Sequence, residues 1–376
     1  MDILGLDRTA MLALRDKAMR VVKALIAALI WCGIPICADD TSARAADFAG
    51  REVSVGPYDQ VFAHVVDGGT WKTTFVLTNL TGTATPYLLG FFGNDGRPLT
   101  LPIVGIGNTA AVSGTIAPYG TLILETAGSS EDLKQGSAIF FCLDRPATDP
   151  AAKPVGTTVG GAAIFRQRVP GRPDFEAVVP VSSLEDSKLT FPFDNSGGFV
   201  TGVALVNAST NLGSALVFLR DEDGKIIGQD LILLGSRNKS VFVVPEKYPQ
   251  TAGKRGSIEV VASTAGLGGL GLRFNPNGSF TSMHPSTLRS SSVSVPDGGR
   301  ECYPAIESRI DGSFDGWTGD TIFKLWNGQV WQQAQYGFRY RYSFSPRVII
   351  YPTLTGCKMV VEGLDLDEGI LVKRIR

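Results

Sequence analysis

The chain has 376 residues, with 35 Lys plus Arg against 36 Asp plus Glu, and a formal net charge of −1 at pH 7. This length accommodates two or three domains, each with its own hydrophobic core. The balanced charge gives no support for a nucleic-acid partner or for binding to an anionic membrane surface. Frequent Gly (44) and Pro (21), with only 19% charged residues, favour an all-β fold with many tight turns.

The N-terminal residues are typical of an export signal. A basic segment, Arg15–Lys23, precedes the apolar run Ala24–Trp31, and Ala43-Arg44-Ala45 offers a cleavage pattern. The apolar run is shorter than the roughly 20 residues that cross a bilayer, so a cleaved signal peptide at 1–46 is favoured over a membrane anchor. Met19 is an alternative start. We expect an exported protein, whether periplasmic, on the outer surface or secreted, with no membrane span in the mature chain.

Two parts of the chain repeat one pattern. A single constant shift aligns Gly69 with Gly197, Trp71 with Phe199, Thr73 with Thr201, Leu77 with Leu205, and Asn79 with Asn207. The same shift aligns the turn sequences Asp95-Gly96 and Asp223-Gly224. Such self-similarity is typical of duplicated architecture. The shared residues form strands and turns and none is reactive, so the repeat predicts architecture and no chemistry.

Short β-prone runs alternate with turns from Phe62 to Pro285, at a spacing typical of sandwiches or barrels. We predict two tandem immunoglobulin-like β-sandwich repeats, at residues 57–182 and 183–285. The expected strands include Thr74–Thr78, Tyr87–Phe92 and Thr121–Glu125 in the first copy, and Val203–Val206, Ala215–Leu219 and Ser240–Val244 in the second. Serine, proline and glycine then predict a linker at 286–304.

The C-terminal residues 305–376 contain several short strand-like runs and predict a small SH3-like β-barrel. Aromatic side chains alternate here with other residues at five positions, Tyr336, Phe338, Tyr340, Tyr342 and Phe344. In a strand, these five rings share one face, and Arg339 and Arg341 share the other.

Two interpretations of these aromatic residues are open. They form a stacking platform for a cell-surface glycan or a protein partner, or they fill the core of a small barrel, which favours large side chains. Core filling is favoured for most of the rings. The candidate ligand-binding residues are Trp317, Trp326, Trp331, Tyr340, Tyr342, Arg339 and Arg341.

Three cysteines follow the predicted signal peptide, Cys142, Cys302 and Cys357. An oxidising compartment allows one disulfide, and Cys302 with Cys357 is the favoured pair because these two bracket the C-terminal region. Sequence alone does not establish the connectivity. Cys142 lies in an apolar strand-like run and is expected to be a buried hydrophobic residue.

No catalytic motif stands out. The two histidines, His64 and His284, lack metal-ligand spacing, and no nucleophile elbow or phosphate-binding loop occurs. Asp221-Glu222-Asp223-Gly224 is predicted as a hairpin turn in preference to a calcium site. Asn79 and Asn207 begin glycosylation-type sequences, but a turn at the end of a strand is preferred. We predict a protein that is no enzyme and has neither cofactor nor metal; its oligomeric state is open.

An alternative function stays open. A hydrolase site, built in loops between the sandwiches from a Ser-His-Asp arrangement or paired carboxylates, would leave no local motif in the sequence. The favoured function is a secreted or envelope-associated, non-catalytic scaffold or binding protein.

Two segments also carry family resemblances. Asp67–Thr74 and Phe165–Phe175 resemble a duplicated β-sandwich unit of secreted bacterial proteins with no assigned activity. Asp311–Gln333, continued through Lys358–Gly363, resembles a small C-terminal β module that recurs in uncharacterised bacterial proteins. The resemblances imply an extracytoplasmic bacterial protein, and they transfer no catalytic residue.

Overall fold

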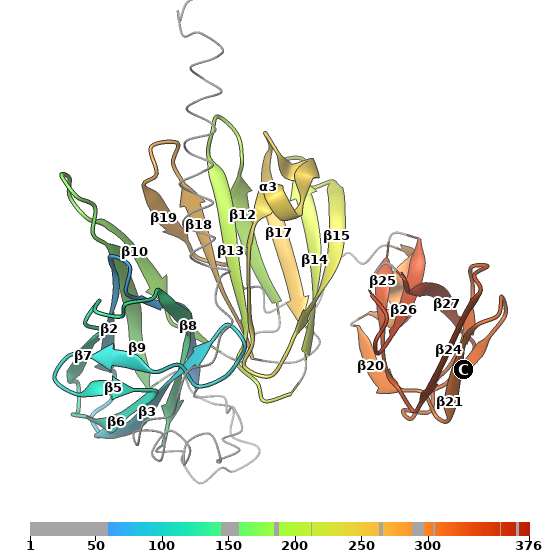
Figure 1. The fold of residues 1–376 in the computed structure, drawn as a ribbon, viewed down its shortest axis with the longest axis horizontal. Helices are drawn as coiled ribbons and strands as arrows, with labels where there is room; N and C mark the ends of the chain where they lie inside the picture. Colours follow the sequence, from blue (N-terminus) through green and yellow to red (C-terminus); the bar gives the residue numbers. More distant parts are fainter. Residues whose placement is uncertain are drawn as a thin grey trace, which may run out of the picture.

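The computed structural model describes residues 59–143, 158–183, 188–211, 213–262, 266–287, 297–303, 305–353, 355–365 and 368–376. The fold is all-β, as predicted, and every strand pairing is antiparallel (Figure 1). The predicted signal peptide lies outside the described residues.

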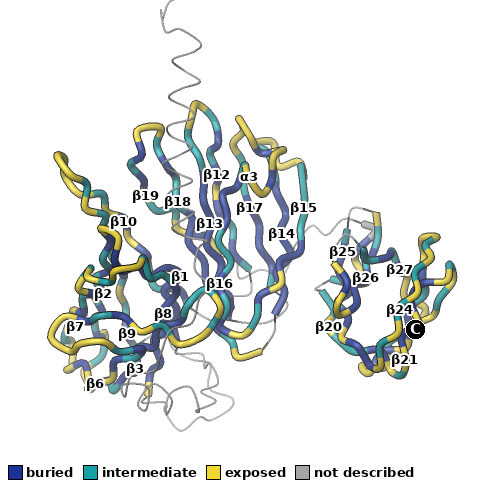
Figure 2. The backbone as a smooth tube through the Cα atoms, viewed as in Figure 1, coloured by how far each residue is buried: buried dark blue, intermediate teal, exposed yellow. Residues whose placement is uncertain are grey.

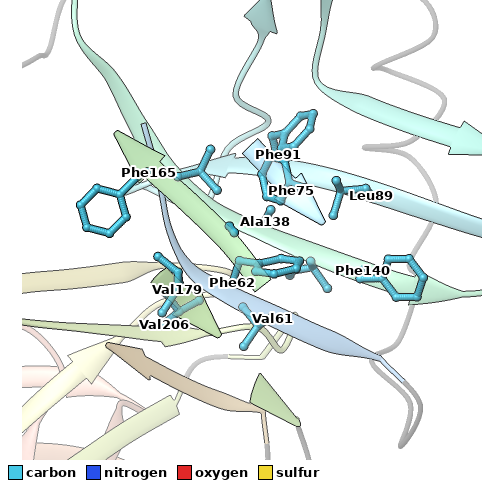
Figure 3. Close-up of a cluster of buried hydrophobic side chains, with 14 of the residues drawn as sticks. Val61, Phe62, Phe75, Leu89, Phe91, Ala138, Phe140, Phe165, Val179 and Val206 are labelled. Atoms are coloured by element: carbon cyan, nitrogen blue, oxygen red, sulfur yellow. The ribbon is translucent and has the colours of Figure 1, made fainter. Parts of the chain in front are cut away.

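The first two sheets enclose an aromatic core. One has the strand order β11 (Ser182–Ser183), β1 (Gln60–Asp67), β8 (Lys134–Cys142), β3 (Thr85–Gly93), β6 (Ala111–Ile116). The other has the order β10 (Phe175–Pro180), β9 (Val159–Gln167), β2 (Trp71–Asn79), β7 (Thr121–Glu125), and a small hairpin joins β4 (Leu101–Ile103) to β5 (Gly107–Thr109). Buried and half-buried residues alternate along β2, so one face of its sheet points into the core. Phe62, Phe75 and Phe91 lie there (Figure 3).

The next two sheets pack face to face around a second core. One, the β14 sheet, has the order β12 (Lys188–Asp194), β17 (Arg255–Ala262), β14 (Gly213–Asp221), β15 (Ile226–Leu234). The other, the β13 sheet, has the order β16 (Lys239–Val243), β13 (Val200–Asn207), β18 (Leu267–Phe274), β19 (Phe280–Met283). A short helix, α3 (Val244–Lys247), and the 3-10 turn η1 (Pro249–Thr251) follow β16. Phe191, Leu205 and Val217 lie in the core between these sheets.

The β13 sheet is buried on both faces. Val203 and Leu205 point into the second core, whereas Ala204 and Val206 pack against the first sheets, where Val206 lies near Val61 (Figure 3). Both faces therefore need apolar side chains, and β13 reads as an almost uninterrupted apolar run.

Two neighbouring glycines in β18 permit this double packing. A Cβ atom on Gly268 would lie 2.2 Å from Cγ1 of Val61 in the first sheets. A Cβ atom on Gly269 would lie 2.5 Å from Cζ of Phe191 in the second core. The Gly-Gly pair thus allows close approach on the two faces of one strand.

The C-terminal sheets cover the outer face of the β14 sheet. Their six-stranded sheet has the order β20 (Ile306–Arg309), β25 (Arg347–Thr353), β26 (Gly356–Val361), β27 (Ile370–Arg374), β23 (Val330–Gln333), β22 (Ile322–Lys324). The two-stranded sheet pairs β21 (Ser313–Trp317) with β24 (Arg339–Phe344). Leu216 and Phe218 of β14 share a buried cluster with Tyr351 and Val360. In Figure 2, β14 is mostly dark blue, whereas the neighbouring β15 is mostly teal.

Asn79 and Asn207 hold equivalent turns together. The side-chain Nδ2 of Asn207 donates to the carbonyl oxygens of Asn211, Leu234 and Gly235 at 2.8, 3.2 and 2.9 Å. Asn79 donates in the same pattern to Thr83, Ile116 and Ala117 at 2.7, 3.2 and 3.1 Å. Both side chains are buried. Each asparagine is thus used inside the fold to join two loops.

We expect Asn207→Ala to destabilise the protein by about 2 kcal/mol or more, because it leaves buried carbonyl groups without a donor. Urea unfolding followed by fluorescence measures the change. Asn108→Ala, at an exposed position of β5, is the matched control and should shift the midpoint little. Equal midpoints for the two variants would show that the Asn207 bonds contribute no stability.

A buried basic pair lies between the first and second sets of sheets. Lys239 Nζ donates to Nδ1 of His64 at 2.7 Å and to the carbonyl oxygen of Gly136 at 2.8 Å. Burial, and secondly the charge of Lys239, lower the pKa of His64 well below 6.5, and burial lowers the pKa of Lys239 from 10.5 to about 7. Folding therefore disfavours protonation of both groups.

This pair should make stability rise with pH. The unfolded chain keeps a proton on His64 up to about pH 6.5 and on Lys239 up to about pH 10.5, whereas the folded chain loses both protons at lower pH. Between these pH values the unfolded chain binds more protons, so a lower pH favours unfolding. Melting temperatures measured from pH 5 to pH 9 should increase. Lys239→Met should flatten the increase above pH 7, and an unchanged slope in this variant would contradict the assignment.

Candidate functional site

The C-terminal sheets carry a row of five exposed rings, here named the aromatic strip: Tyr336, Phe338, Tyr340, Tyr342 and Phe344. Their exposed fractions range from 63% for Tyr342 to 86% for Tyr336. The prediction that most rings fill the core is wrong for all five. Tyr340, Tyr342 and Phe344 lie on β24, in a two-stranded sheet whose outer face nothing in the described chain covers, and Tyr336 and Phe338 lie in the segment just before that strand. The strand β24, which carries three of these rings, lies at the side of the C-terminal sheets remote from β14 (Figure 1).

The core of these sheets is filled by other aromatic side chains. Trp317 is 3% exposed and Trp331 is fully buried, and both belong to one cluster with Phe314 and Phe323. Rings of Trp317 and Phe323 meet edge to face, with centroids 5.6 Å apart. Of the candidate ligand-binding residues, Trp317 and Trp331 are therefore core residues.

Arg339 and Arg341 lie on the inner face of β24, opposite the rings. Arg339 Nη1 lies 2.5 Å from Oε1 of Glu368, and Arg341 Nη1 donates to the carbonyl oxygen of Gly363 at 2.5 Å. The backbone amide of Asp365, and after it Arg339, lower the pKa of Glu368, which keeps the pair ionised. Both arginines thus anchor the strand to the loop after β26.

A glycine in β21 allows the two-stranded sheet to form. Gly316 has a φ of 104°, a value that favours glycine, and a Cβ atom there would lie 1.7 Å from the carbonyl oxygen of Arg339. The β21–β24 register shifts between Phe314 and Gly316, which marks a bulge. The close approach holds β24 against β21 and leaves the rings on the outside.

Trp326 lies near one end of the aromatic strip. It is 65% exposed and occupies the turn between β22 and β23. The Arg309 guanidinium carbon is 5.8 Å from the Trp326 ring centroid, and Arg309 Nη1 donates to the carbonyl oxygen of Ser345 at 2.8 Å. Because Ser345 follows Phe344, Arg309 connects Trp326 to the end of the row. Trp326, Tyr340 and Tyr342 are thus the exposed rings among the candidates.

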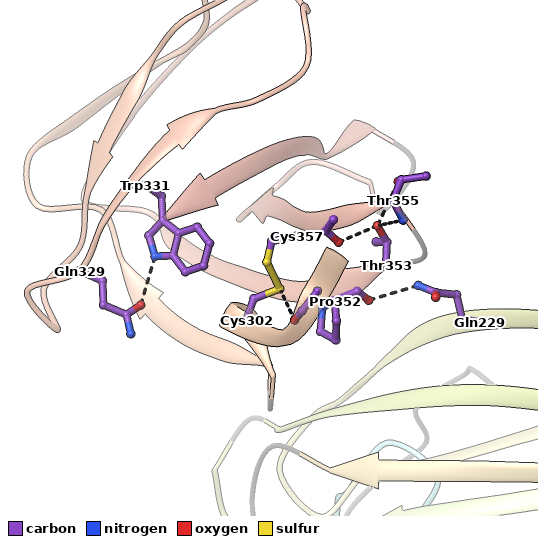
Figure 4. The surroundings of a disulfide bond; sticks show 10 residues. Gln229, Cys302, Gln329, Trp331, Pro352, Thr353, Thr355 and Cys357 are labelled. Carbon is purple, nitrogen blue, oxygen red and sulfur yellow. Dashed lines mark hydrogen bonds between the residues drawn. A yellow bond between two sulfur atoms is a disulfide. The ribbon is translucent and has the colours of Figure 1, made fainter. Parts of the chain in front are cut away.

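A disulfide joins Cys302 to Cys357, the pair favoured from the sequence (Figure 4). It attaches the 3-10 helix η2 (Asp297–Cys302), part of the predicted linker, to β26. Both cysteines are buried. Nearby, Gln229 Nε2 of β15 donates to the carbonyl oxygen of Pro352 at 3.2 Å. Cys142 is buried too, with its Sγ 3.6 Å from Oγ1 of Thr158.

Removal of this disulfide by Cys302→Ser with Cys357→Ser should destabilise the C-terminal sheets by about 4 kcal/mol, because the bond closes a loop of 55 residues. The measurement is urea unfolding under oxidising conditions. Cys142→Ser serves as the comparison that keeps the disulfide. Identical unfolding of the double variant and the wild type would contradict this expectation.

The acidic turn between β14 and β15 is satisfied by its own backbone. Oδ1 of Asp221 accepts from the amides of Asp223 at 3.2 Å and Lys225 at 2.9 Å. An open hollow beside it is lined by acids together with Lys254 and Arg255. Within the described ranges, no group of three or more His, Cys, Asp or Glu side chains is arranged to hold a metal ion. The turn prediction for Asp221–Gly224 matches this geometry.

No protein-family model, curated protein or solved structure matches this chain. In the part of the chain that the structure describes, no helix combines the length and apolar character needed to span a membrane. The functional conclusion therefore depends on the residues and geometry given above.

Proposed function

We propose that this protein is an exported, non-catalytic binding protein whose aromatic strip contacts a ligand outside the cell or in the envelope. The observation that carries the proposal is the exposure of five large rings at alternate sequence positions, three of them on β24. Exposed apolar side chains are normal when they are scattered, but a contiguous row is typical of an interaction site. Aromatic rings supply large contact areas with few rotatable bonds, which suits recognition.

The remaining sheets act as a scaffold in this proposal. We assign them to two immunoglobulin-like sandwiches that arose by duplication, followed by a small SH3-like barrel. The matching hydrogen bonds of Asn79 and Asn207 support the duplication. The first 46 residues are proposed as the signal peptide that exports the chain.

A hydrolase in the loops between the sandwiches is the weaker candidate. His64, the histidine nearest to that junction, is buried and accepts a hydrogen bond from Lys239. A general base must reach a substrate proton, and this ring is buried with its Nδ1 bonded to Lys239. No arrangement in the described residues favours catalysis over binding.

The test uses the full chain with substituted rings. Deletion of residues 305–376 would uncover Leu216 and Phe218, so the loss of binding in a truncated chain would be ambiguous. We expect the double variant Tyr340→Ala with Tyr342→Ala to bind an insoluble bacterial cell-wall and envelope fraction at least about tenfold more weakly. This corresponds to a loss of about 1.4 kcal/mol in binding free energy.

Tyr119→Ala is the matched control, because Tyr119 is 72% exposed in the first set of sheets, outside the strip. It should bind as the wild type does. Circular dichroism of each variant shows whether the fold is kept. Wild-type retention by a folded double variant would reject the strip as the binding site.

A further inference from the structure

We propose that the aromatic strip binds a neutral, linear polysaccharide whose chain runs along β24. The inference rests on the proposed binding function and adds the chemical class of the ligand. It follows from three properties of the strip: its linear shape, the chemistry of its rings, and the absence of an available positive charge on its outer face in the described chain.

The shape of the strip selects an elongated ligand. Tyr340, Tyr342 and Phe344 occupy alternate positions of β24, where four residue steps span about 13 Å, and Tyr336 and Phe338 continue the series just before the strand. The rings project from the surface, as their high exposure shows, so they do not enclose a small molecule. A compact ligand would touch one or two rings, whereas a chain with repeated flat faces would touch all of them.

The chemistry of the rings selects a ligand with apolar faces and polar edges. Tyr336, Tyr340 and Tyr342 each present an apolar ring face and a hydroxyl group at the rim. A pyranose sugar has the complementary form, with C–H groups on its faces and hydroxyl groups around its edge. Ser313, which pairs with Phe344, and Asp315 are exposed on the adjacent strand β21. Their oxygen atoms are hydrogen-bond acceptors for sugar hydroxyl groups.

The charges around the strip exclude an anionic chain. Binding of single-stranded nucleic acid combines stacking rings with a positively charged groove. Here Arg339 and Arg341 point to the opposite face and are bound to Glu368 and Gly363. Arg309, at the Phe344 end of the strip, is bonded to the carbonyl oxygen of Ser345, whereas Asp315 is exposed on β21 beside the rings and repels phosphates and uronic acids. The same charge disfavours anionic lipid headgroups. A neutral polymer meets no such penalty.

Isothermal titration of the full chain tests the proposal. The probes are oligosaccharides of two to six units from a β-1,4-glucan, a β-1,4-mannan and an α-1,4-glucan, with polygalacturonate and an oligothymidylate as charged comparisons. We expect at least one neutral series to bind, with an affinity that increases with chain length as more rings are covered. The charged polymers should bind at least about tenfold more weakly.

Substitutions then separate ring stacking from simple apolar contact. Tyr340→Leu with Tyr342→Leu keeps apolar side chains without rings, and we expect at least about tenfold weaker binding to the best probe. Tyr342→Phe keeps the ring and should stay within about threefold of the wild type. Tyr119→Ala should not change the affinity. Equal affinity of the leucine variant and the wild type would overturn the stacking proposal.

Two further outcomes distinguish this inference from the proposed function. In the first outcome, no neutral oligosaccharide or parent polysaccharide binds, while the protein is still retained on the envelope fraction and this retention requires Tyr340 and Tyr342. The ligand class is then wrong and the binding function stands. If the charged polymers bind as well as the neutral ones, the ligand class is wrong again. If neither glycans nor the envelope fraction bind, both proposals fail.

Discussion

The whole structure depends on apolar burial on both faces of the central sheets. The β13 sheet packs its inner face on the β14 sheet and its outer face on the first sheets. The β14 sheet, in turn, is covered on its outer face by Tyr351 and Val360 of the C-terminal sheets. Each layer thus hides the apolar surface of the next. The aromatic strip lies at the end of this series, and no part of the chain that the structure describes forms a further layer over it.

The two similar halves differ where their surroundings differ. The outer face of β2 carries Thr74, Val76 and Thr78, which are partly exposed to solvent. The aligned positions in β13 are Gly202, Ala204 and Val206, which are buried against the first sheets. Threonine keeps a high β propensity and tolerates water, whereas the buried face needs apolar or small side chains. The difference between the aligned positions therefore follows burial.

Much of the fold was predictable because strand formation is largely local. The expected strands Thr74–Thr78 and Val203–Val206 lie inside β2 and β13, and the expected disulfide pair is joined. Burial of the rings was not predictable. Period-two alternation shows which residues share a face, but only tertiary packing decides whether that face is covered. The contact between His64 and Lys239, which are 175 positions apart, likewise has no local signal.

The disulfide has a mechanical consequence for a ligand held on β24. If the C-terminal strands separated under tension, the shortest covalent path from Phe344 to Cys302 would run through Cys357 and the disulfide. That path extends to about 50 Å, against about 145 Å for the route from Phe344 back to Cys302 along the chain. Oxidation therefore limits how far a loaded strand can move from the rest of the protein, and reduction lengthens that tether.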